Sequence, residues 1–371
     1  MKKNFIIIFV MIILLLFCLS HSQKDTSSNS CIPPIENLAI PREEVRYLKK
    51  DESIIPIGWS RIIELPNTTG PEKNTLCLSL MVHRGNFDQI WFFGNQSISI
   101  FHINNNTWED GPIIPFSGVN PKVALSMNGI IWYSSNDVKD PFLFYYYDEQ
   151  SNQFIPKIKK ENNWNHIQIV DMEANQDGIL WFLILDINKN AISLNSFDPN
   201  SSEIKKIISD VEYSNLVIAD DNSLFLMNST NELIHYFPDV KKIELFTLPD
   251  DNNSSGSLTS IYLDSLNHLW VSDRGWFDFS KPDSTIWYSI IRSPIFIDYL
   301  EPQGLFVWSR PQINFESSNH YLWFSSSRGT AWLDPDSGKW CLFTTYPSLI
   351  MEDSSNNLWI LIEKTLYKYH Q

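Results

Sequence analysis

The sequence is short of alanine and glycine, which number six and 13 among its 371 residues. Aromatic residues are abundant instead, with 14 Trp, 14 Tyr and 23 Phe. Alanine is the best helix former, whereas aromatic and β-branched residues fit pleated strands, so this composition favours an all-β fold. The same shortages exclude the collagen-like and coiled-coil classes.

Basic residues are also scarce: 28 Lys and Arg stand against 43 Asp and Glu, for a formal net charge of −15. An acidic surface repels phosphate backbones and anionic lipid, so we expect no nucleic-acid partner. The apolar content of 43% is normal for a globular chain and excludes global disorder.

Motifs for metal or cofactor binding are absent from the sequence. It has four cysteines, without a CxxC pair and without the Cys and His spacing of a zinc site. It has no Gly-Xaa-Ser-Xaa-Gly elbow, no P-loop and no dinucleotide fingerprint. We therefore expect no metal and no cofactor, and we assign no catalytic residue.

Residues 1–22 have the pattern of a secretory signal peptide. Lys2 and Lys3 precede an apolar run over 5–19, which is short for a membrane span of about 20 residues. Small residues favour cleavage before Gln23. Two alternatives stay open, a lipidated Cys18 and an uncleaved anchor, and each would give the protein its one contact with a membrane. All three interpretations place the rest of the chain outside the cytoplasm.

A polar stretch over 23–54, with Pro33 and Pro34, predicts a flexible N-terminal tether. Cleavage before Gln23 would leave Cys31, Cys77 and Cys341. Their odd number allows one disulfide with a free thiol, or no disulfide at all.

An internal repeat determines the expected fold of residues 55–371. Each unit has a polar turn, an apolar residue and then an aromatic anchor, as in 177–181 (Asp-Gly-Ile-Leu-Trp). The spacing between anchors averages about 45 residues, and each unit contains four short strand patterns. The anchors are Trp91, Trp132, Trp181, Phe225, Trp270, Trp323 and Trp359.

Seven such units predict a seven-bladed β-propeller of four-stranded blades. The last unit lacks one strand, and residues 57–66 resemble the fourth strand over 339–347. We therefore predict that this N-terminal strand, which holds Trp59, pairs beside Tyr367 and closes the ring. The anchor side chains should fill the seams between neighbouring blades.

The repeat resembles two families, the two-component regulator propellers of extracytoplasmic sensors and the streptogramin-lyase-like propellers. The resemblance rests on the turn-apolar-Trp unit and on the later aromatic–Asp turn, as in 197–198. It implies a propeller over about residues 55–371. The lyase family uses a His and a Glu with magnesium, and no such pair matches residue by residue in this chain.

Titratable residues recur near the first turn of each unit. His268 and His320 lie in such turns, and His83 with Arg84 ends an inner strand. Acids at the same place indicate either turn formation or a ring of carboxylates that holds a cation. These acids are Asp171, Glu173, Asp220, Asp264, Glu316, Glu352 and Asp353.

The candidate ligand-binding residues lie near the one spacing that lengthens to 53 residues, between Trp270 and Trp323. Arg beside exposed Trp suits an anionic group, a sugar ring or a peptide. Loops between second and third strands, and between blades, share one face, where long loops favour binding. The candidates are Arg274, Trp276, Trp308, Arg310 and Arg328.

The expected function is an exported, non-catalytic, sensor-like recognition module that binds a protein, a peptide or a glycan on this face. One alternative is a metal-dependent lyase or hydrolase with its site at the mouth of the central channel. Another is a cell-envelope scaffold.

Overall fold

The structure is a computed structural model, and its described residues are all strand, turn or loop. It describes residues 59–64, 80–84, 88–93, 98–114, 121–126, 129–137, 139–160, 166–211, 213–228, 232–247, 261–271, 275–278, 312–326, 329–335, 339–344, 348–362 and 365–369. The predicted signal peptide and tether lie outside these residues. Within them, no helix has the length and apolarity needed to cross a bilayer.

The described strands form antiparallel sheets in which neighbours in sequence pair with each other. Sheet 1 contains β2 (Leu80–Arg84), β3 (Gln89–Phe93), β4 (Ile98–His102) and β5 (Thr107–Asp110). Sheet 2 contains β6 (Lys122–Leu125), β7 (Ile131–Ser134), β8 (Phe142–Asp148) and β9 (Gln153–Lys159). Sheet 3 contains β10 (Ile167–Ala174), β11 (Leu180–Asp186), β12 (Ala191–Asp198) and β13 (Glu203–Val211). Sheet 4 contains β14 (Tyr213–Ile218), β15 (Leu224–Asn228), β16 (Glu232–Phe237) and β17 (Lys242–Thr247).

The remaining sheets follow the same order along the chain. Sheet 5 has three strands among the described residues: β18 (Ile261–Leu263), β19 (His268–Val271) and β20 (Gly275–Asp278). Sheet 6 contains β21 (Gln312–Glu316), β22 (Leu322–Ser326), β23 (Gly329–Asp334) and β24 (Lys339–Thr344). Sheet 7 contains β25 (Ser348–Glu352), β26 (Leu358–Ile362), β27 (Thr365–Tyr369) and β1 (Trp59–Glu64).

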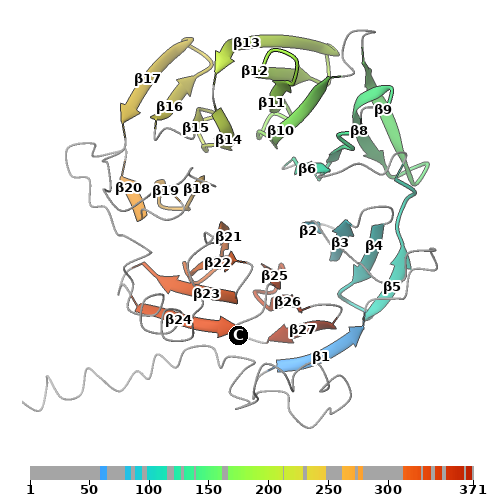
Figure 1. Cartoon of the computed structure of the whole chain (residues 1–371). Helices are drawn as coiled ribbons and strands as arrows, with labels where there is room; N and C mark the ends of the chain where they lie inside the picture. Colours follow the sequence, from blue (N-terminus) through green and yellow to red (C-terminus); the bar gives the residue numbers. More distant parts are fainter. Residues whose placement is uncertain are drawn as a thin grey trace, which may run out of the picture.

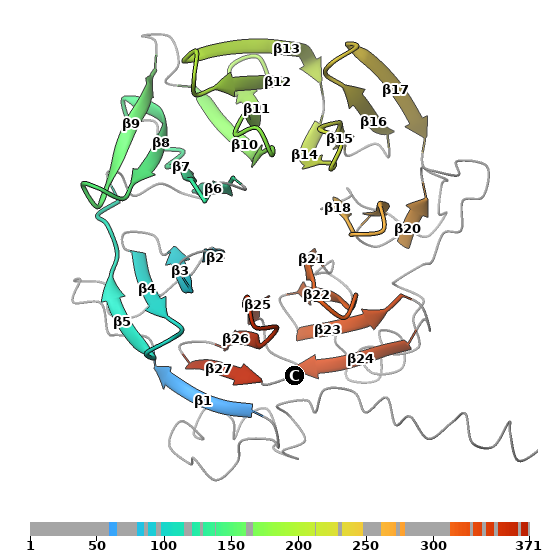
Figure 2. The same ribbon diagram turned by 180° about the vertical axis from the view of Figure 1, so that it is seen from behind.

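The sheets stand around a common centre as the blades of a β-propeller (Figure 1). The first strand of each sheet lies innermost and the last strand lies on the perimeter, as the reverse view also shows (Figure 2). The fold is therefore all-β among the described residues, as the composition predicts.

The ring is closed by the N-terminal strand. β1 pairs antiparallel with β27, with Trp59 opposite Tyr369 and Arg61 opposite Tyr367. The predicted pairing of a strand near Trp59 with the last unit is thus present. This pairing gives the last sheet its fourth strand and covers the outer edge of β27.

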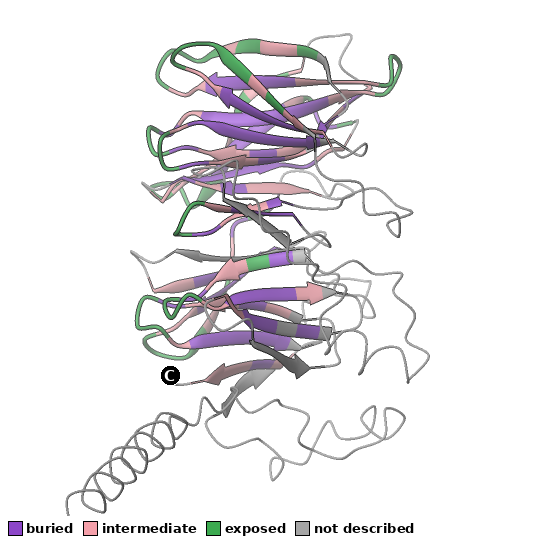
Figure 3. Cartoon of the chain, turned by 90° about the vertical axis from the view of Figure 1, so that its left-hand side faces the viewer, coloured by how far each residue is buried: buried purple, intermediate pink, exposed green. Residues whose placement is uncertain are grey.

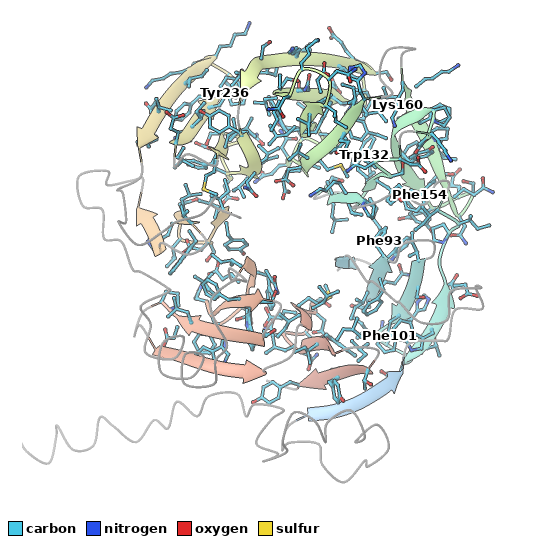
Figure 4. The ribbon with its side chains drawn as sticks, in the orientation of Figure 1. Phe93, Phe101, Trp132, Phe154, Lys160 and Tyr236 are labelled. Atoms are coloured by element: carbon cyan, nitrogen blue, oxygen red, sulfur yellow. The ribbon has the colours of Figure 1, made fainter. Side chains whose placement is uncertain are left out.

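Each aromatic anchor packs in a cluster shared by its own sheet and the next one. Trp132 contacts the apolar side chains of sheet 3, and Trp359 contacts Phe101 of sheet 1 at a centroid distance of 5.3 Å. Such burial of large aromatic side chains is a main source of packing energy. The strands are largely buried and the hairpin turns exposed (Figure 3), and labelled aromatic side chains such as Trp132 and Phe154 lie among the strands (Figure 4). The predicted role of the anchors in the seams is confirmed.

Glycine and asparagine recur in the first turn of the repeat because the backbone there takes a positive φ. The backbone φ is 81° at Gly178, 64° at Asn222 and 61° at Asn356, a left-handed conformation that these residues tolerate best. His320 takes the same position with a φ of 64°. We call the side of the ring that carries these turns, between the first and second strands, the turn face.

Candidate functional site

Most of the predicted ligand-binding residues lie outside the described part of the chain, namely Arg274, Trp308, Arg310 and Arg328. The backbone of Trp276 lies in β20, opposite Trp270 of β19. The described strands nonetheless fix where two of the connections begin and end.

Both of these connections leave the same end of neighbouring sheets. Val271 pairs with Gly275 across 272–274, and Ser326 pairs with Gly329 across 327–328. Each connection joins a second strand to a third, so both lie at the end opposite the turn face. We call this side of the ring, which carries the connections between second and third strands, the loop face.

Sheet 2 shows how one connection on the loop face is held. Asp140, which is 1% exposed, accepts hydrogen bonds from Ser135 Oγ and Tyr145 Oη, both at 2.5 Å, and from Phe142 N at 2.9 Å. Burial, followed by the contact with Asp140, raises the pKa of Tyr145 above its ordinary value. A buried carboxylate with this many donors fixes the path of the backbone around it.

A second contact ties the same connection to the next blade. Asn136 Nδ2 donates to Ile169 O at 2.8 Å, and Ile169 N donates to Asn136 Oδ1 at 2.7 Å. Lys160 Nζ donates to the carbonyl oxygen of Asp137 at 2.8 Å; Lys160 is labelled in Figure 4. The loop face of sheets 2 and 3 is therefore ordered by side-chain hydrogen bonds and not only by the strands.

On the turn face, carboxylates of one blade accept hydrogen bonds from serines of the preceding blade. Glu316 accepts from Ser265 N at 2.6 Å and from Ser265 Oγ at 2.7 Å. Glu352 accepts in the same way from Ser318 N at 2.6 Å and Ser318 Oγ at 2.8 Å. These two carboxylates hold neighbouring turns together.

Two other acids of the turn face stabilise their own turns. Asp264 Oδ2 accepts from Trp270 Nε1 at 2.8 Å, and Asp353 Oδ2 accepts from Trp359 Nε1 at 2.8 Å. Both carboxylates also accept from backbone amides of the turn, such as Asn357 N. This is the contact pattern that the interpretation as turn formers predicts.

His320 lies in the predicted turn, whereas His268 is the first residue of β19, and both contact an acid four residues earlier. His268 Nδ1 lies 2.9 Å from Asp264 Oδ2, and His320 Nδ1 lies 2.8 Å from Glu316 Oε1. Among the described residues, no three His, Cys, Asp or Glu side chains gather in a geometry that could hold a metal ion. The side chains of His83 and Arg84, in β2, are not part of the described structure.

Asp171 and Glu173 lie inside the innermost strand of sheet 3, whereas Glu316 and Glu352 are the last residues of their innermost strands. Asp171 Oδ2 accepts from Leu216 N of sheet 4 at 2.9 Å. Burial raises the pKa of Asp171, although the charge of Lys122 and two backbone amides oppose the shift. Burial, followed by the charge of Asp171, raises the pKa of Glu173 to about 8.

Tyr262 lies at the position of sheet 5 that corresponds to Glu173 in sheet 3, two residues before the turn. Its hydroxyl oxygen accepts from Glu316 N at 2.9 Å, and burial raises the pKa of its phenol. Glu173 is close enough for its charge to contribute to that shift. Glu173, with its raised pKa, and the phenol of Tyr262 lie on the innermost strands of sheets 3 and 5, and such groups are suited to proton transfer or to hydrogen bonding with a bound molecule.

Sequence reasoning missed the loop-face network around Asp140. Its members, Ser135, Asp140 and Tyr145, follow no repeat and no known spacing. The sequence places Glu173 among the acids near the first turns, and its position two residues before the turn is the available signal that its role differs.

No protein-family model matches the sequence, and no curated protein matches it. Many solved structures resemble the fold. Streptogramin B lyase matches with a TM-score of 0.60 and 13% identity, over 84% of this chain and 97% of that one. The extracellular domain assigned to a hybrid two-component system of B. thetaiotaomicron matches with a TM-score of 0.56 and 12% identity, over 86% of this chain and 42% of that one.

A third similar structure is YCF48 bound to D1 peptide, with a TM-score of 0.56 and 15% identity, over 85% of this chain and 96% of that one. At these identities the likeness establishes the β-propeller fold. It also confirms the predicted resemblance to the streptogramin-lyase-like and two-component regulator propellers at the level of structure.

Proposed function

We propose that this chain is an exported, seven-bladed propeller that binds a protein, a peptide or a glycan through its loop face without transforming it. The observation that carries the proposal is the hydrogen-bond network of Asp140, which orders a loop-face connection before any ligand arrives. A preformed surface on a rigid scaffold binds with little rearrangement, and its affinity is not reduced by a cost of ordering loops.

The structural neighbours support this choice of function. One is the extracellular domain assigned to a hybrid two-component system, and another is YCF48 with a bound peptide. In this chain the proposed anchors are Arg274, Trp276, Trp308, Arg310 and Arg328, which combine a planar cation with flat aromatic surfaces. Arg274 and Arg328 belong to connections that leave the same end of neighbouring sheets.

The proposed location is extracytoplasmic, with residues 1–22 as the export signal. The apolar run and its two preceding lysines support this assignment. Mass spectrometry of the N-terminus tests it: a mature chain that begins at Gln23 supports cleavage, whereas a lipid on Cys18 or an intact Met1 identifies one of the alternatives.

A thermal-shift panel tests the binding function. A ligand that binds only the folded chain raises the melting temperature by mass action. We expect a shift with a soluble glycan or peptide that EDTA leaves unchanged, and loss of that shift in Arg274→Ala and Trp276→Ala. Lys206→Ala, an exposed cation on the outer strand β13, is the control that keeps it. Shifts that persist in both anchor variants contradict the loop-face assignment.

A second function, catalysis at the centre of the ring, is favoured by Glu173. A carboxyl group with a pKa of about 8 can act as a general acid near neutral pH. This is the proton-transfer part of the lyase or hydrolase alternative. A melting temperature that one divalent ion raises, together with loss of lyase or hydrolase activity in Glu173→Gln, would support catalysis over binding alone. If no glycan, peptide or divalent ion changes the melting temperature, the scaffold function is favoured.

A further inference from the structure

Strand β17 differs from the other outer strands in what it exposes. Ile243 is 49% exposed and Leu245 is 60% exposed, and Val240 in the preceding turn is 70% exposed. Ile243 and Leu245 are alternate residues of one strand, so they project from the same side of it. The strand lies on the perimeter of the ring, and among the described residues it is the last strand of sheet 4 (Figures 1 and 2).

Other outer strands whose side chains are described carry residues that discourage strand pairing. β5 exposes Glu109 and Asp110, and β9 exposes Pro156 and two lysines. β13 exposes Lys205 and Lys206. Charges and proline on an edge are the usual protection against pairing with another chain. Among their described side chains, these three strands expose no large apolar residue, whereas β17 exposes Ile243 and Leu245 in addition to its charged Lys242.

We infer that two copies of this chain pair through β17, antiparallel and edge to edge, about a twofold axis at Ile243. This goes beyond the proposed ligand binding, because β17 lies at the perimeter and not on the loop face. Twofold antiparallel pairing places a residue opposite its own counterpart, and every other pair follows from that choice.

The charges of the strand select Ile243 as the residue on the axis. With Ile243 on the axis, Lys242 lies opposite Glu244 of the partner subunit, and each Glu244 lies opposite Lys242 of the partner subunit. Within one chain Lys242 already contacts Glu244, so the pair of strands would carry an alternating network of four charges. An axis at Glu244 would instead place two carboxylates opposite each other, which is unfavourable.

The apolar side of the strand completes the match. Ile243 would meet its own counterpart, and Leu245 would lie opposite the stem of Lys241 of the partner subunit. Glu244 and Phe246 project from the other side, where Phe246 packs against the apolar cluster between sheets 4 and 5. Pairing therefore covers Ile243 and Leu245 without disturbing a seam between blades.

Sedimentation velocity of the full chain over a concentration series tests the inference. We expect a monomer–dimer equilibrium in the unmodified chain and a monomer at every concentration in Leu245→Lys. Ile187→Lys is the matched control, because Ile187 is an exposed isoleucine (47%) in the β11–β12 turn of another sheet. Dimerisation should persist in that control. A monomeric unmodified chain, or equal dimerisation of Leu245→Lys, overturns the inference.

A charge exchange tests the register independently of folding. Lys242→Glu should raise the dimer dissociation constant by about tenfold or more, because it creates two Glu–Glu contacts. The double variant Lys242→Glu/Glu244→Lys should restore the original constant, since opposite charges face each other again. A double variant that dimerises no better than Lys242→Glu rules out the axis at Ile243.

Discussion

Ser354 Oγ lies 2.9 Å from Asp88 Oδ1, although 266 residues separate the two in sequence. The contact links the turn of the last sheet to the turn of the first. Asp88 also accepts from Asn104 Nδ2 at 2.8 Å. The contact between Ser354 and Asp88 thus repeats the serine–carboxylate contacts of the other turns at the place where the ring closes.

Closure depends more on the apolar seam than on this exposed contact. Leu366 is fully buried with Trp359 and Phe101 between the last and first sheets. We expect Leu366→Ala to lower the free energy of unfolding by about 3 kcal/mol. Ser354→Ala should cost about 0.5 kcal/mol, because its hydrogen bond is exposed. Urea unfolding monitored by tryptophan fluorescence measures both, and equal losses would contradict this ranking.

Loss of the hydrogen bond between Asp353 and Trp359 should lower the free energy of unfolding more than loss of the exposed Ser354 hydrogen bond. Asp353→Ala would leave the buried Trp359 Nε1 without its acceptor, at a cost of about 2 kcal/mol. Asp239→Ala, in an exposed turn, is the control with no expected loss. Urea unfolding of the two variants gives the comparison, and similar free energies would contradict the role of Asp353.

The Asp353 carboxylate also makes the stability of the fold depend on pH in the acid range. Burial alone would raise the pKa of Asp353, but hydrogen bonds from Trp359 and Asn357 outweigh it, and the net pKa is lowered. A lowered carboxyl pKa stabilises the fold above the unfolded value near pH 4, and this contribution is lost as the pH falls through the folded value. The Asp353→Ala chain should therefore differ most from the unmodified chain at neutral pH and least near pH 2, measured by thermal unfolding.

The equivalent position in sheet 3 offers a stabilising change. Trp181 Nε1 is buried and has no hydrogen-bond partner in the described structure, and Asn175 stands where Asp264 and Asp353 stand in their turns. Asn175→Asp should supply an acceptor for Trp181 and raise the free energy of unfolding by about 1 kcal/mol. The substitution should give no gain in a Trp181→Phe chain, which has no indole N–H. A gain of the same size there would show another cause.

The repeat made the fold predictable from sequence. The turn, the apolar residue and the anchor recur because each blade meets its neighbour in the same way, as Trp132 does in the seam to sheet 3. The pairing of β1 with β27 followed from the likeness of two strands that fill the same place in their blades.

Features that do not repeat could not be predicted. Ile243 and Leu245 alternate with polar residues as half-buried strand residues do, and the sequence alone does not show that both side chains are exposed. The Asp140 network joins Ser135 and Tyr145 without a motif. The role of Arg274 and the other loop-face anchors stays a prediction, because their side chains lie outside the described residues.

Glu173 predicts a pH dependence of the opposite sign to that of Asp353. Its pKa rises from 4.5 to about 8 in the folded chain, chiefly through burial, so the folded state keeps a proton that the unfolded state releases. Stability should therefore fall as the pH rises between about 4.5 and 8, by up to about 4 kcal/mol. Glu173→Gln removes the ionisation and should remove that slope.

The measurement is the free energy of unfolding at pH 4, 6, 8 and 9 for the unmodified chain, Glu173→Gln and Glu149→Gln. Glu149 lies exposed in the β8–β9 turn, so its variant should follow the unmodified chain at every pH. Glu173→Gln should match them at pH 4 and exceed them at pH 9, because at pH 9 the Glu173 carboxylate of the folded chain carries its charge. If it falls below them at pH 9, the ionised carboxylate must be stabilised by a partner at the centre of the ring, and Glu173 is then an anion at neutral pH and no proton donor.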